Sequence, residues 1–191
     1  AKGYGMRTGV VAGSDYVLSD ATTRSLDILR QNSTFSPAGW LAQMEDTIIS
    51  SVQPNGFALY GELAPLSAGD ANASPDASGD AYQQALLQAD QTFGQLLNWL
   101  AQHGLLQHTL IALTTSQAQA NHTDADNFYG MGVTGQGTSK QSLLALSWPG
   151  ACSGALDTTT YSSFVVAPTL MRVMGLPAPS EARLQAPGGC L

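Results

Sequence analysis

The sequence predicts an α/β domain built on a mainly parallel sheet with helices on both faces. Two observations lead to this fold class. Short apolar runs typical of strands alternate with segments in which apolar residues recur at helical spacing. In addition, an amphipathic segment at 80–103 leads into a run at 109–114 that is apolar on both faces, as strands of parallel sheets with helical crossovers are. The 191 residues are enough for one well-buried domain, and we expect a single one over 1–191.

Two strands are expected in the first part of the chain. The apolar run 8–12 ends in Gly13-Ser14-Asp15, as a buried strand and its loop do. A second strand covers 57–60. The segment 64–80 is rich in Ala, Ser, Gly, Asp and Pro without periodicity, so it is predicted to be an exposed loop.

A helix is predicted between these strands, at 37–52. Ser36 can cap it, and Pro37 suits its first turn. Five apolar residues are expected on its buried face: Trp40, Leu41, Met44, Ile48 and Val52.

The second part of the chain is expected to begin with a helix at 80–103, which Gly104 ends as a C-cap. Its apolar face is predicted to carry seven residues: Tyr82, Leu86, Ala89, Phe93, Leu96, Leu97 and Leu100. Buried strands are expected at 109–114 and 143–147, separated by a long polar loop at 119–137. A last helix covers 164–174 and is closed by Gly175-Leu176-Pro177.

The charge composition excludes nucleic acid as a partner. Seven basic and 14 acidic side chains give a formal net charge of −7, and no basic cluster could neutralise phosphates. No apolar run is long enough to span a bilayer, and the first residues do not resemble a signal peptide. Any membrane contact is therefore expected through segments outside this sequence.

The two cysteines, Cys152 and Cys190, leave two alternatives open. They are either free thiols or a disulfide that closes a loop of about 40 residues, worth about 3–4 kcal/mol in the chain-entropy model. The low share of charged residues and the even cysteine count favour an oxidising compartment.

Several motifs occur together in order and spacing. Gly104 to Ile111 contains G-x-x-x-x-T-L-I, Trp148-Pro149-Gly150 follows an apolar run, and Pro168-Thr169-Leu170 precedes Gly175-Leu176-Pro177. This succession resembles the second half of sulfatases and their relatives in the alkaline phosphatase superfamily. The resemblance implies an alkaline-phosphatase-like fold of which this chain is the C-terminal portion. The family's first strand, which delivers a metal-binding Asp and the nucleophile, has no match here.

Among these relatives, the chain most resembles the YejM (PbgA) type, inner-membrane proteins with a degenerate periplasmic sulfatase-like domain concerned with lipopolysaccharide control. Lipoteichoic-acid-synthase and phosphoethanolamine-transferase types remain alternatives. The resemblance implies a periplasmic domain of an inner-membrane protein, with a lipid headgroup or a membrane protein as its partner.

The metal-binding residues of the active relatives are replaced in this sequence. Their strand equivalent to 109–114 ends in Ser-Asp-His-Gly, and here Ser116 stands at the Asp position and Gln117 at the His position. Neither residue offers an anionic oxygen or an imidazole nitrogen to a cation. Lys140 lies in the segment where the family normally has a further His or Lys. The resemblance therefore implies a pseudo-hydrolase with no catalytic residue and no cofactor.

One local cluster keeps an alternative open. His122, Asp124 and Asp126 have ligand-type side chains, and although a solvated loop is favoured, they could form a weak cation or ligand site. The alternative function is a metal-dependent hydrolase or transferase of phosphate or sulfate esters. It would hold one divalent cation and be completed by a missing N-terminal part.

Two carboxylates are expected at strand ends, where α/β sheets place functional residues. Asp15 follows the strand at 8–12, and Glu62 follows the strand at 57–60. Either could line the former cleft, although solvated loop carboxylates are the favoured interpretation.

Overall fold

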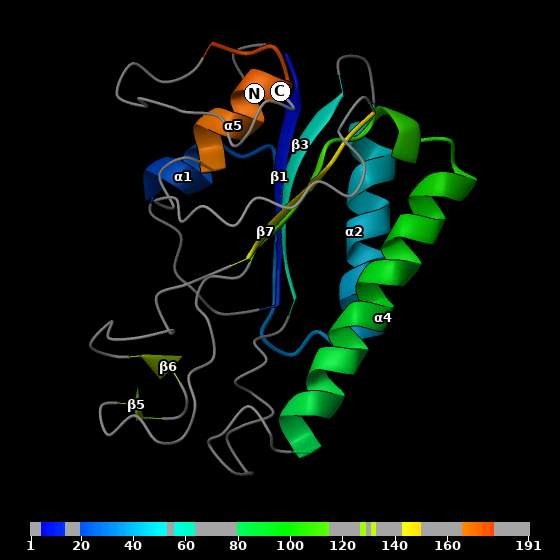
Figure 1. The fold of residues 1–191 in the computed structure, drawn as a ribbon. Coiled ribbons are helices and arrows are strands. Elements are labelled where there is room, and N and C mark those ends of the chain that lie inside the picture. Colours follow the sequence, from blue (N-terminus) through cyan, green and yellow to red (C-terminus); the bar gives the residue numbers. More distant parts are fainter. Residues whose placement is uncertain are drawn as a thin grey trace.

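The computed structural model describes residues 5–13, 20–52, 56–63, 80–114, 127–128, 131–132, 143–149 and 166–177. Its elements follow one another along the chain as drawn in Figure 1. They are β1 (Arg7–Ala12), α1 (Asp20–Ser25), β2 (Ile28–Gln31), α2 (Pro37–Ser51), β3 (Phe57–Glu62), α4 (Asp80–Gln102), the 3-10 helix η2 (Leu106–His108), β4 (Ile111–Thr114), β5 (Asn127–Phe128), β6 (Met131–Gly132), β7 (Leu144–Ser147) and α5 (Val166–Val173).

A three-stranded parallel sheet organises the first half of the chain. Its order is β2-β1-β3, so β1 has a parallel neighbour on each edge. The predicted strands at 8–12 and 57–60 are confirmed as β1 and β3, and the α/β class is confirmed with them. α1 and β2 were not predicted, because both are short: α1 has six mostly polar residues, and β2 has four, of which Arg30 and Gln31 are polar.

The sheet presents a different set of side chains to each side. A Cβ added to Gly61 would lie 2.8 Å from Cζ2 of Trp40, so Gly61 faces α2. Its neighbours Tyr60 and Glu62 therefore point to the opposite face, since side chains alternate along a strand. In Figure 1, α2 and α4 lie on one side of the sheet, and α1 and α5 lie on the other.

The predicted helix at 37–52 is confirmed as α2. The Ser36 side chain accepts a hydrogen bond from the Gly39 amide at 3.1 Å, which is the expected N-cap. Three of the five predicted face residues are buried, namely Trp40, Met44 and Ile48, whereas Leu41 and Val52 are half-buried. The indole Nε1 of Trp40 also donates a hydrogen bond of 3.1 Å to the Val11 carbonyl, which ties α2 to β1.

A third layer, α4, lies outside α2. Leu96 and Leu100 of α4 join Val11, Trp40, Met44 and Ile48 in one buried cluster. The predicted end of this helix is confirmed: Gly104 has φ +67°, the Leu105 amide donates to the Leu100 carbonyl at 2.8 Å, and the Gly104 amide donates to the Ala101 carbonyl at 3.0 Å.

Five of the seven residues predicted for the apolar face of α4 are buried or half-buried, namely Ala89, Phe93, Leu96, Leu97 and Leu100, and the side chain of Tyr82 lies outside the described part of the structure. Leu86 is 48% exposed, so its expected place on a buried face is wrong. Leu86 is exposed because α4 is longer than α2. The first turns of α4 extend beyond the end of α2 and lie beside no other helix in Figure 1.

The predicted strands at 109–114 and 143–147 are present as β4 and β7, but their expected burial is wrong. They pair with each other in antiparallel fashion, and within the described residues neither joins the three-stranded sheet. Leu113 is 40% exposed and Leu143 is 61% exposed. A two-stranded ribbon has a covered face and an open face, and only Ile111 packs against the core cluster.

The remaining predictions are partly tested. The long loop expected at 119–137 contains the short antiparallel pair β5–β6, so the loop prediction is wrong for these four residues, and the rest of it lies outside the described residues. The loop expected at 64–80 lies outside them up to Asp80, where α4 begins. Helix α5 confirms the last predicted helix, and Gly175, at φ +68°, follows it. Across the described part of the chain, no helix is long and apolar enough to cross a bilayer.

Candidate functional site

The carboxyl ends of β1, β2 and β3 meet in one row of the parallel sheet. Ala12 pairs with Gln31 on one side and with Glu62 on the other. The hydrogen bonding continues one step beyond the strands, because the Gly13 amide donates to the Glu62 carbonyl at 2.8 Å and the Asn32 amide donates to the Ala12 carbonyl at 3.1 Å. The backbone at this edge is therefore fixed, and open α/β sheets bind ligands at this edge.

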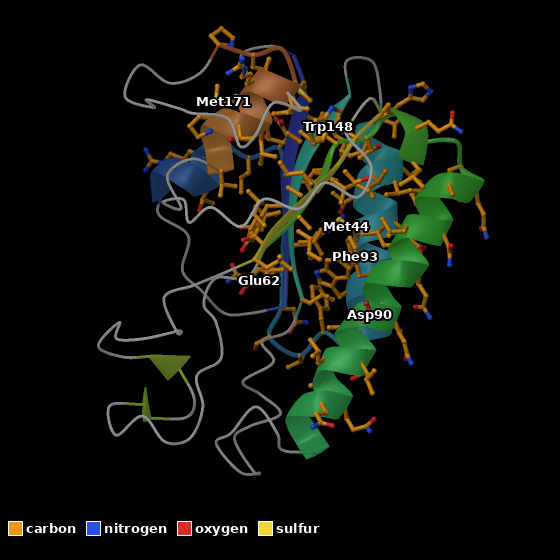
Figure 2. All side chains as sticks on the ribbon, in the orientation of Figure 1. Met44, Glu62, Asp90, Phe93, Trp148 and Met171 are labelled. Atoms are coloured by element: carbon orange, nitrogen blue, oxygen red, sulfur yellow. The ribbon has the colours of Figure 1, made fainter. Side chains whose placement is uncertain are left out.

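Glu62 is the predicted site residue that the structure locates at this edge. Its side chain is half-buried and points to the face opposite α2, and it is labelled at the lower end of the sheet in Figure 2. Asp15, the other carboxylate expected here, follows β1 but lies outside the described residues. Glu62 supplies one anionic group at the edge, with the polar side chain of Gln31 in the same row.

A second feature lies at the other end of the sheet. An open hollow of about 360 Å³ is lined by Leu106, Gln107, Ser147, Trp148 and Pro149. Trp148 is labelled near the upper end of the molecule in Figure 2, away from Glu62. The lining combines an indole ring with an amide and a hydroxyl and includes no ionisable side chain, so these residues provide shape and hydrogen bonds but no acid or base.

The hollow was not predicted from the sequence. Its two sides come from segments that are about 40 residues apart, which the antiparallel pairing of β4 with β7 brings together. The start of η2 and the end of β7 become neighbours because Ile111 pairs with Ser147. The only sequence signal was the presence of Trp148-Pro149 directly after an apolar run.

Most of the predicted site residues lie outside the described part of the chain. They are Asp15, Ser116, Gln117, His122, Asp124, Asp126, Lys140, Cys152 and Cys190. The structure does fix the end of β4 at Thr114, two residues before Ser116. Within the described ranges, no group of three or more His, Cys, Asp or Glu side chains is arranged to hold a metal ion.

One described histidine has a defined structural role at the end of α4. The rings of Trp99 and His103 are stacked with centroids 4.1 Å apart, and Nδ1 of His103 lies 2.8 Å from the Trp99 carbonyl oxygen. A carbonyl oxygen only accepts hydrogen bonds, so Nδ1 carries the proton in this arrangement. The Trp99 carbonyl also accepts the His103 backbone amide at 3.1 Å, so the imidazole adds a second hydrogen bond to this carbonyl in the last turn of α4.

Comparisons with known proteins provide no relative. No protein-family model matches the chain, and neither a curated protein nor a solved structure is significantly similar to it. The resemblance drawn from the motifs is therefore untested by these comparisons.

Proposed function

We propose that this chain is a non-catalytic, sulfatase-like domain of the bacterial envelope that binds a lipid headgroup or a membrane-protein partner. The observation that carries the proposal is the Ser116-Gln117 pair, which stands where active relatives have a metal-binding Asp and His. β4 ends two residues before this pair, as the resemblance requires of the strand that precedes the metal ligands.

The position of two of the motifs around one hollow supports the proposal. Leu106 and Gln107 belong to the G-x-x-x-x-T-L-I motif, and Trp148 and Pro149 belong to the W-P-G motif. All four line the same hollow. Two motifs that are distant in sequence are thus parts of one structural unit, as expected if both derive from a single family pattern.

The arrangement of the elements is compatible with an alkaline-phosphatase-like domain. A parallel sheet has α2 and α4 on one side and α1 and α5 on the other in Figure 1. In this proposal the carboxyl edge at Glu62 is the remnant of the catalytic edge, and the domain lies in the periplasm as part of an inner-membrane protein.

The residues at the former metal site do not fit a divalent cation. A serine hydroxyl and a glutamine amide are weak ligands compared with a carboxylate and an imidazole. They can, however, donate and accept hydrogen bonds, which suits hydroxyl, amine and amide groups of a headgroup. The net charge of −7 opposes general attraction to an anionic bilayer, so binding depends on such specific contacts.

The first test is metal binding by the purified chain after equilibration with Zn²⁺ or Mn²⁺ and desalting. We expect no stoichiometric metal in the natural chain. The double variant Ser116→Asp with Gln117→His should bind Zn²⁺ at least roughly tenfold more tightly, because it restores two strong ligands. Metal retained by the natural chain and lost in His122→Ala would instead support the metal-dependent hydrolase or transferase.

The second test concerns the partner. Vesicles of phosphatidylethanolamine and phosphatidylglycerol, prepared with and without lipopolysaccharide, are sedimented with the chain. We expect co-sedimentation that increases with the lipopolysaccharide content and persists at high salt, since hydrogen bonds rather than net charge carry it. Equal recovery with both kinds of vesicle would contradict a headgroup-specific role and direct attention to a protein partner.

A further inference from the structure

We draw no further inference here: the strongest candidate, the open hollow lined by Leu106, Gln107, Ser147, Trp148 and Pro149 between η2 and the end of β7, carries nothing because the Gln107 and Ser147 side chains that could orient a ligand are exposed and nothing in the structure shows what would replace solvent there.

Discussion

The parallel sheet and the β4–β7 ribbon derive from similar apolar runs but differ in burial. In β1, Val10, Val11 and Ala12 are at most 6% exposed, whereas Leu113 of β4 is 40% exposed. β1 has a paired strand on each edge and α2 against one face, while β4 pairs with β7 alone within the described residues. An apolar run thus predicts that a strand forms, and the neighbouring elements determine how deeply it is buried.

The two regions also differ in how closely their strands and helices approach one another. A Cβ at Gly9 would lie 2.8 Å from Cδ2 of Leu59, and one at Gly61 would collide with Trp40 and Met44. Glycine at these two positions allows the strands and α2 to pack closely. The described strands β4 and β7 contain no glycine, which is consistent with their open face.

The largest contrast is expected from truncating one apolar side chain in each region. Ile48→Ala removes a side chain that is 3% exposed, and it should lower the free energy of unfolding by about 2–5 kcal/mol. Leu113→Ala, at a position that is 40% exposed, should lower it by less than about 1 kcal/mol. Urea denaturation of both variants measures the difference, and equal losses would mean that β4 is as deeply packed as the sheet.

Alanine substitutions at two glycines are expected to change the free energy of unfolding in opposite directions, and by less than Ile48→Ala does. Gly61→Ala should destabilise the chain by about 1–3 kcal/mol, because the new methyl group meets the Trp40 ring. Gly94→Ala should stabilise the chain by about 0.5–1 kcal/mol, because a Cβ at this position meets no atom within 4 Å and alanine is the better helix former. Chemical denaturation at low protein concentration compares the two. The same sign for both would contradict the close approach of α2 to β3.

Replacing the glycine that follows α4 or the one that follows α5 is expected to cost a similar amount of stability, although the two helices lie on different sides of the sheet. Gly104 and Gly175 have φ values of +67° and +68°, and both follow the last turn of a helix. Alanine at either position should cost about 1–2 kcal/mol, since the left-handed conformation is unfavourable for any residue with a Cβ. Thermal unfolding of the two variants tests this. A negligible effect at Gly175 alone would indicate that α5 frays in solution.

Much of the fold could be predicted because its signals are local. Ser36 and Gly104 mark helix ends, and the periodicity at 80–103 identifies α4. The burial of Leu86 and Leu113 could not be predicted, since it depends on which neighbours cover them in space.

The candidate site was predictable to a smaller extent. Glu62 was expected from its position at a strand end, and the structure brings it into one row with Ala12. The hollow beside Trp148 depends on the pairing of β4 with β7, which links segments about 40 residues apart. No local pattern specifies such a pairing, and antiparallel and parallel alternatives have the same apolar runs.

The smallest effect is expected from the ion pair that links β2 to α2. Arg30 Nη2 lies 3.8 Å from Asp46 Oδ2, and the two side chains are 50% and 66% exposed. Exposed pairs are screened by water and salt, so Asp46→Asn should change the free energy of unfolding by less than about 0.5 kcal/mol. Urea denaturation at low and high salt checks both the size and the salt dependence. A loss above about 1 kcal/mol would show that charge, and not only the apolar contact of α2 with β1, holds this region together.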